Sequence, residues 1–343
     1  MGVTFDKRSS ITIKGIAVLL MVYHHLFIHR SDFVFCFGAF PDIVRYKAAL
    51  FGKICVSVFF FLSGFGINRN RSRVFNFNVE VKKVVKRLRT LFLNYWKVFL
   101  LFVPLGFMLG KIRFSAVEFI LNFIGWEHSY NIEWWVIRKY TLIVLLSPAL
   151  SWFFSQIKIK QRIFVEVLCG IALLLLCRGA LNNELLSKLW TALDTMLPWI
   201  LCFFSGYLTA EHRVFERLYE KMPGGGEAPY ILLLLSVISR CIVCRDWNDL
   251  YQDVIIAPIF IYACWSICLR NTSRILIKGV YLIGKYSMDI WLIHTFFAYY
   301  YFSDFIYGFR FDILIFLVCM AFSVFASMMV QVTWDSLLRL VRK

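Results

Sequence analysis

Two basic side chains that could do acid–base chemistry lie in the first apolar stretch of the chain, where lipid makes charge costly. Lys14 and His25 are 11 residues apart, and at about 100° per residue this separation completes three helical turns with about 20° left over. Both side chains should therefore lie on one helix face, about 16.5 Å apart along the axis. This alignment predicts an anion held at Lys14 and proton transfer at His25, because imidazole titrates near neutral pH.

His24 directly precedes His25 and is rotated by about 100° away from it. We expect His24 to support His25 or to contact a neighbouring helix. A single histidine in a membrane helix is explained equally well by a hydrogen bond that serves packing. The catalytic interpretation of His25 therefore depends on its alignment with Lys14.

A second group of residues with chemical potential follows the second apolar stretch. Arg69 and Arg71 come shortly after Ser63, Gly64 and Gly66, and further lysines and arginines follow them. Paired guanidinium groups bind phosphate through two parallel hydrogen bonds, and small residues let a ligand or a helix approach the backbone closely. The same basic residues also fit retention of this loop on the cytoplasmic side, or binding of anionic lipid.

Near the end of the chain, Ser287, Trp291 and His294 are spaced so that they share one helix face. A hydrogen-bonded helix contact is the favoured interpretation of this trio, ahead of direct catalysis. The ten cysteines include two close pairs, but these lie in apolar stretches without a nearby histidine. Cysteine there behaves as a small buried hydrophobe, and we predict no metal site.

The elements that position these residues should be membrane helices. The chain has 343 residues, of which 60% are hydrophobic and 17% charged, and its mean hydropathy is +0.69. Soluble domains contain only about 45–50% apolar residues. The composition excludes a soluble multidomain protein, a disordered chain and a small disulfide scaffold, and it predicts an all-α polytopic membrane protein.

Crossing a bilayer as a helix takes about 20 mostly apolar residues. The segment Ser115–Gly125 is apolar but too short for this, so we expect it to be interfacial or re-entrant. We expect one transmembrane domain over residues 1–343, with no soluble appendage. About ten transmembrane helices are predicted, at residues 11–28, 48–67, 91–110, 134–154, 163–177, 193–210, 229–243, 253–269, 280–302 and 313–334.

The distribution of positive charge predicts the orientation. Loops on one side of these spans hold 22 Lys and Arg residues, eight of them between positions 69 and 89, and loops on the other side hold 10. Arg240 is counted as snorkelling from a helix end, and Lys53 also fits snorkelling. Positive residues are retained in the cytoplasm, so both termini should be cytoplasmic. The net charge of +17 therefore does not call for nucleic acid.

Together these segments resemble acyltransferase family 3, polytopic membrane enzymes that acylate cell-surface sugars. In that family ten residues separate a basic residue, usually arginine, from an essential histidine, and here Lys14 and His25 occupy these positions. The family's Arg-x-Arg motif corresponds to Arg69 and Arg71. Lysine in place of arginine at position 14 departs from the pattern. The resemblance covers nearly the whole chain and rests on Ile13–Ala17 with His24-His25, Phe59–Phe65, Glu133-Trp134-Trp135 with Ser147-Pro148, and Gly284–Ser287 with Ile290–His294.

The resemblance implies an acyl-CoA donor, most simply acetyl-CoA, at the cytoplasmic face and a hydroxyl of a glycan or glycolipid as acceptor. It implies an O-acyltransferase, of the type that transfers groups other than aminoacyl groups, in a bacterial inner or plasma membrane. The expected partners are acyl-CoA, the glycan acceptor and membrane lipid. In this interpretation His25 and Lys14 are catalytic, donor binding involves Arg69, Arg71, Lys14 and Ser63, and the supporting residues are His24, Glu133, Trp134, Ser287 and His294.

Alternatives remain open at this point. His25 should act as a general base on the acceptor hydroxyl, with a transient acyl-histidine as the second route. A transporter or flippase of a glycolipid or polysaccharide precursor would share the helices and buried charges, but favours internal repeats and broken helices, which the sequence does not show. A structural or sensory membrane protein would not explain why Lys14 and His25 are aligned beside a loop able to bind phosphate.

Overall fold

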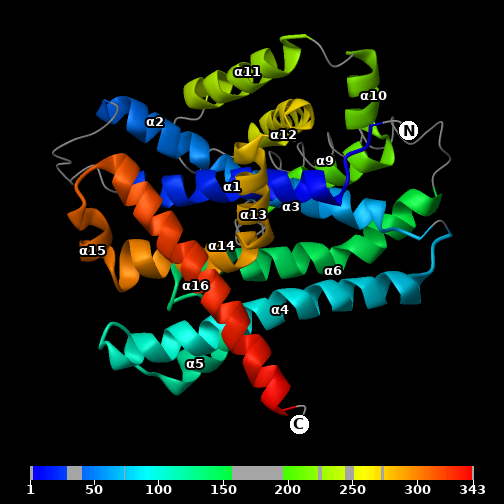
Figure 1. Cartoon of the computed structure of the whole chain (residues 1–343). Helices are drawn as coiled ribbons and strands as arrows, with labels where there is room; N and C mark the ends of the chain where they lie inside the picture. The colour runs from blue at the N-terminus through cyan, green and yellow to red at the C-terminus, as the bar shows by residue number, and fades with distance from the viewer. Residues whose placement is uncertain are drawn as a thin grey trace, which may run out of the picture.

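The computed structural model describes residues 3–28, 41–72, 74–156, 196–222, 226–243, 251–271 and 274–341. Within these ranges the elements are helical and no β-strand is found (Figure 1). In chain order they are α1 (Lys7–Phe27), α2 (Asp42–Gly52), α3 (Ile54–Arg69), α4 (Phe77–Met108), α5 (Ala116–Phe123), the 3₁₀ turn η1 (Ile132–Trp134), α6 (Trp135–Gln156), α9 (Leu197–Glu211), α10 (Val214–Lys221), α11 (Ala228–Val243), α12 (Asp253–Arg270), α13 (Ile275–Lys285), α14 (Ser287–Thr295), the π-helical turn η3 (Phe296–Tyr300), α15 (Ser303–Gly308) and α16 (Asp312–Val341).

Several of these helices can cross a bilayer, which confirms an all-helical, multi-pass architecture but not the number ten. In the described part of the chain, six segments are long and apolar enough to span: Lys7–Phe27, Asp42–Arg69, Phe77–Met108, Ile132–Phe153, Asp253–Arg270 and Asp312–Ser336.

The remaining predicted spans differ from the structure for identifiable reasons. The predicted span 280–302 is broken, because α13 ends at Lys285 and α14 begins at Ser287. The helices α9 and α11 have only 15 and 16 residues in the described ranges, fewer than the ~20 that cross the hydrocarbon layer. The predicted span 163–177 lies outside the described residues, and the orientation of the termini stays a prediction.

The helix α4 begins well before its predicted span. Asn76 provides the N-cap, and its side chain accepts a hydrogen bond from the backbone amide of Val79. The basic residues that follow are good helix formers, so a segment that the sequence analysis treated as loop becomes the first turns of α4. The apolar segment Ser115–Gly125 contains the eight-residue helix α5, which is too short to span, as predicted.

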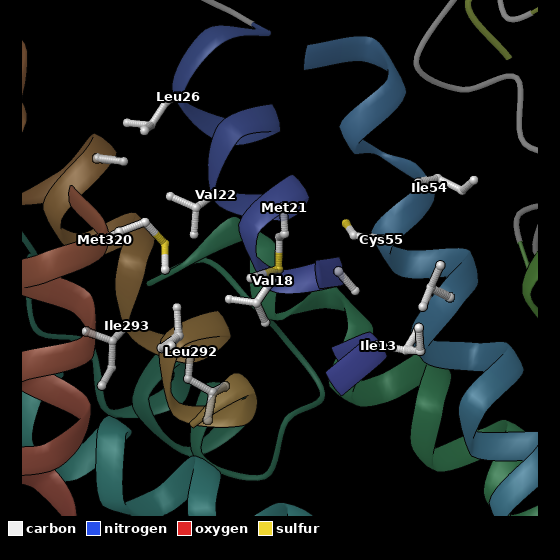
Figure 2. Close-up of a cluster of buried hydrophobic side chains, with 14 of the residues drawn as sticks. Ile13, Val18, Met21, Val22, Leu26, Ile54, Cys55, Leu292, Ile293 and Met320 are labelled. Carbon is white, nitrogen blue, oxygen red and sulfur yellow. The ribbon is translucent and has the colours of Figure 1, made fainter. Parts of the chain in front are cut away.

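The helix α1 lies inside the bundle and contacts α2, α3, α13, α14 and α16 (Figure 1). The side chain of Asp6 caps its start by accepting from the amide of Ser9 at 2.8 Å. Apolar residues from α1, α3, α14 and α16 form the core around it. Figure 2 shows members of this cluster: Ile13, Val18, Met21, Val22 and Leu26 of α1, with Ile54, Cys55, Leu292, Ile293 and Met320.

Glycines set the closest helix contacts. A Cβ atom at Gly64 of α3 would collide with the carbonyl oxygen of Phe203 in α9, and one at Gly206 of α9 would collide with the carbonyl of Phe61. The two backbones therefore touch directly, as in small-residue contacts between membrane helices. Of the two roles proposed for the small residues near position 64, helix packing is the one that Gly64 performs.

A buried ion pair joins α11 to α12, so the prediction that Arg240 snorkels from its helix end is wrong. Its side chain is 1% exposed, and its Nε atom lies 2.7 Å from Oδ1 of Asp253 in α12. Arg240 also donates to the carbonyl of Leu50, and Ser57 of α3 donates to Oδ2 of Asp253 at 2.7 Å. Asp253 neutralises the positive charge of Arg240 inside the protein, so the guanidinium does not need to extend to the lipid headgroups.

Replacing Gly64 or Gly206 with alanine should destabilise the protein by about 1–3 kcal/mol, because the added methyl group must push two backbones apart. Gly279→Ala is the matched control, since a Cβ at this exposed position in α13 meets no atom within 4 Å. Thermal melting in detergent measures the effect. Equal melting temperatures for the Gly64→Ala and Gly279→Ala proteins would contradict the direct α3–α9 contact.

Candidate active site

His25 lies at the centre of a buried chain of three titratable side chains. Its Nδ1 atom is 2.7 Å from Nε2 of His294 in α14, and its Nε2 atom is 3.1 Å from Oε2 of Glu133 in η1. His25 and His294 are 5% and 0% exposed. The structure thus brings together His25 and two of its predicted supporting residues from distant parts of the sequence.

The hydrogen-bond partners of His294 determine how many protons this cluster of three side chains must hold. Its Nδ1 atom lies 3.0 Å and 2.9 Å from the carbonyl oxygens of Ile290 and Trp291, which only accept, so Nδ1 must carry a proton. The His25–His294 contact and the His25–Glu133 contact each need a proton as well. Two neutral imidazoles supply two protons for three contacts. The cluster therefore holds one additional proton, which balances the carboxylate and leaves the buried group without net charge.

The carboxylate of Glu133 is positioned by its own short turn. Asn131 accepts a hydrogen bond from the backbone amide of Glu133 at 3.1 Å and donates to the hydroxyl of Thr295 at 2.7 Å. Trp134 is buried, and its indole nitrogen donates to the carbonyl of Leu292 at 3.2 Å. These bonds tie η1 to α14, so Glu133 and His294 approach His25 as parts of one assembly.

Two tyrosines that the sequence analysis did not identify hold the end of α1. Tyr299 donates to the carbonyl of His25, and Tyr307 donates to the carbonyl of Leu26 at 2.8 Å. These carbonyls belong to the last turn of α1, where the helix itself provides no donor. Tyr299 lies in the π-helical turn that follows His294, a distortion that often accompanies functional sites.

His24 and Ser287, the other two predicted supporting residues, do not bond directly to Glu133, His25 or His294. His24 lies 2.7 Å from the carbonyl oxygen of Ala49 through its Nδ1 atom, so it fastens α1 to α2. Ser287 is the buried first residue of α14, seven residues from His294, or about 10.5 Å along the helix.

A second polar cluster lies at the other end of the same α1 face. Lys14 is half-buried and within electrostatic reach of Tyr140 of α6 and Arg87 of α4. Ser63 of α3 donates to the Tyr140 hydroxyl at 3.2 Å and accepts from Nη1 of Arg87 at 3.1 Å. Glu133 and Tyr140 are seven residues apart, which is about two helical turns, so the segment formed by η1 and α6 contributes one residue to each of the two clusters. Arg87 and Tyr140 were not predicted as site residues.

Arg69 and Arg71, predicted to bind phosphate, both contact carboxylates. Arg69 is paired with Glu216 of α10, which is 1% exposed in its side chain. Nη2 of Arg71 is 3.2 Å from Glu211 of α9, and Nη1 is 3.1 Å from the Tyr207 hydroxyl. Burial lowers the pKa of Arg71, but Tyr207 and Glu211 outweigh it and raise the pKa above its ordinary value. Phosphate binding by this pair stays a prediction, and it requires exchange with the carboxylates.

A cavity of about 520 Å³ opens beside Arg71, where α3 and α6 end. Its wall combines aromatic rings with polar side chains, which suits a planar ligand that also carries hydrogen-bonding groups. The lining residues are Arg71, Ser72, Val74, Phe75, Trp152, Ser155 and Gln156. Among the residues that the structure describes, no group of three or more His, Cys, Asp or Glu side chains could hold a metal ion.

The model of acyltransferase family 3, described as an acyltransferase domain, matches residues 9–332. The chain belongs to acyltransferase family 3. Searches of curated proteins and of solved structures found no match. As a member of acyltransferase family 3 with several spanning helices, the protein is a multi-pass membrane acyltransferase. The single domain over residues 1–343 stays a prediction.

The Arg69–Glu216 pair can be tested in the absence of any ligand. Arg69→Met should destabilise the protein by about 1–3 kcal/mol, because it leaves a buried carboxylate without its cation. Adding Glu216→Leu should recover most of this loss, since the carboxylate is removed too. Thermal melting of the two single variants and the double variant measures the coupling. Simple additivity would show that the pair does not hold α3 against α10.

Proposed function

We propose that the protein transfers an acyl group, most simply acetyl, from acyl-CoA to a hydroxyl of a glycan or glycolipid. The observation that carries the proposal is the buried Glu133–His25–His294 chain in a member of acyltransferase family 3. A hydroxyl is a poor nucleophile until a base removes its proton, and imidazole is suited to that step near neutral pH.

The reaction can be written with these residues. Nε2 of His25 takes the proton of the acceptor hydroxyl while the hydroxyl oxygen attacks the thioester carbonyl. The C–S bond then breaks, the ester forms, and the CoA sulfur leaves with the proton from His25. Glu133 stabilises the transient imidazolium, and His294 holds the ring through Nδ1. Nε2 acts as a base only when the additional proton of the cluster has left the site, because Glu133 is then ionised and Nε2 has a free lone pair for the hydroxyl proton. A transient acyl-histidine remains the second route.

In this proposal the donor lies lengthwise along α1. Lys14 and the basic residues near it receive the phosphates, and the pantetheine arm extends towards His25. The cavity beside Arg71, with Trp152 in its wall, offers a place for the planar base. Both termini and the Lys14 end of the bundle would then face the cytoplasm. The acceptor glycan would approach from the opposite side of a bacterial inner or plasma membrane. Lipid would surround the bundle.

The path between Lys14 and His25 is filled in this structure. Val18 and Met21 occupy the same α1 face between the two residues, and both are buried in the core shown in Figure 2. The acyl arm reaches His25 only after these side chains move. The structure therefore corresponds to a closed state of the proposed enzyme.

A glycolipid flippase is a second candidate, favoured by one observation. The break at Tyr286 between α13 and α14 interrupts a predicted span, and interrupted helices are typical of transporters. The two functions separate in purified protein. Movement of a labelled glycolipid across liposomes without acyl-CoA would favour the flippase, whereas acyl-CoA consumption coupled to ester formation favours the transferase.

His25→Gln should lower kcat for acyl transfer by about 10²–10⁴-fold, because the base is lost. Glu133→Gln should lower kcat at least about tenfold, since the carboxylate no longer stabilises the imidazolium. Transfer from radiolabelled acetyl-CoA to a glycan extract by protein in liposomes provides the measurement.

The matched controls for these variants are His128→Gln and Glu127→Gln. Both residues lie in the loop before η1, where His128 is half-buried and Glu127 is exposed. Both should keep kcat within about twofold of the unmodified protein, since neither side chain belongs to the cluster. Full activity of the His25→Gln protein would refute the role of His25.

A further inference from the structure

Arg87 is brought to the Lys14 cluster by the early start of α4. Its Nη1 atom lies 3.1 Å from the hydroxyl of Ser63 and 3.4 Å from the Ser63 carbonyl. Gly66 lies one turn farther along α3, and a Cβ there would come 3.5 Å from the Arg87 guanidinium. The guanidinium therefore rests against a stretch of α3 that has little side-chain bulk.

Arg87 and Lys14 differ from the other basic residues near this end of the bundle. Arg69, Arg71 and Lys83 each contact a carboxylate. Within the described ranges, no carboxylate forms an ion pair with Lys14 or Arg87. Both are half-buried, and each lies within reach of the other's charge. Two like charges partly withdrawn from water repel each other, and an anion between them offsets that cost.

The neighbouring hydroxyls complete a set of donors that suits phosphate. Arg87 supplies a planar fork and Lys14 supplies a point charge. The Tyr140 hydroxyl accepts from Ser63, so it can donate its own proton to a ligand. Charge-assisted hydrogen bonds of this kind are roughly twice as strong as neutral ones.

The position of the cluster also favours a donor that reaches His25. Ser63 precedes Arg69 by six residues, which is about 9 Å along α3. A phosphate at Ser63 is therefore about 9 Å nearer to the His25 end of the bundle than one at Arg69. This shortens the distance that the acyl arm must cover.

We propose that Arg87 and Tyr140, together with Lys14, bind a phosphate group of the acyl-CoA donor, with Ser63 orienting the guanidinium. Arg69 and Arg71 instead hold α3 against α9 and α10 through Glu216 and Glu211. This inference rests on the proposed transferase function and assigns the donor's charged group to one site within it.

Isothermal titration of coenzyme A into the full-length protein in neutral detergent tests the assignment. Arg87→Gln keeps a hydrogen-bonding group for Ser63 but removes the charge, and it should raise the Kd at least about tenfold. Tyr140→Phe should raise the Kd about threefold to tenfold, because one hydrogen bond is lost. Arg89→Gln is the matched control, since Arg89 is exposed on the same helix, and should stay within about twofold. In turnover, Arg87→Gln should raise KM for acetyl-CoA and leave kcat nearly unchanged.

The outcomes separate this inference from the proposed function. If the unmodified protein does not bind coenzyme A, the transferase proposal fails. If it binds and the Arg87→Gln protein binds equally well, the phosphate assignment is overturned. Loss of binding in the stable Arg69→Met/Glu216→Leu protein, with binding kept in Arg87→Gln, would also overturn it.

A lipid headgroup is the other source of a phosphate, and a second arm addresses it. Vesicles of phosphatidylcholine with phosphatidylglycerol replace coenzyme A as the probe. We expect Arg87→Gln and the unmodified protein to bind these vesicles equally. Weaker vesicle binding by Arg87→Gln, together with unchanged coenzyme A binding, would assign the site to lipid and contradict the proposal.

Discussion

The hydrogen-bonded chain from Glu133 through His25 to His294 is the interaction on which the rest of the structure depends. The backbone carbonyls of α14 require a proton on Nδ1 of His294, and this requirement propagates through His25 to Glu133. A buried carboxylate is costly unless it is neutralised. The additional proton meets that cost, and the cluster must release this proton before His25 can act as a base.

The surrounding helices position the hydrogen-bonded side chains of Glu133, His25 and His294. Contacts through Gly64 and Gly206 bring α3 and α9 together, and the Arg240–Asp253 pair joins α11 to α12 and α3. Hydrogen bonds from tyrosines after α14 hold the last turn of α1. The resulting bundle places two polar clusters at opposite ends of one α1 face, with an apolar core between them. Chemistry along this face would require the core to open transiently, and a site that excludes water suits the proposed transfer from a thioester.

Part of this arrangement could be predicted from sequence because it depends on one helix. The alignment of Lys14 and His25 follows from helical periodicity alone, and α1 is a continuous helix over both residues. The partners of His25 come from α14 and η1, so the resemblance to the family indicated them but no local pattern could place them. Arg87 falls in a loop by apolar content alone, whereas the N-cap at Asn76 starts α4 at Phe77 and makes Arg87 helical. Arg69 and Arg71 look like a phosphate site in sequence, since their carboxylates come from residues far along the chain. The break at Tyr286 has no proline to mark it, and an apolar composition on both sides concealed it.

We propose above all that the donor lies along α1, with its phosphates at Lys14 and its acyl group at His25. A cryo-electron microscopy structure with a thioether analogue of acetyl-CoA, which cannot transfer its acyl group, tests this claim most directly. We expect the carbonyl of the analogue beside the His25 ring, phosphate oxygens against Lys14 and Arg87, and Val18 and Met21 displaced from the path. An analogue bound with its acyl group away from His25, while the core between the two clusters stays closed, would contradict the account.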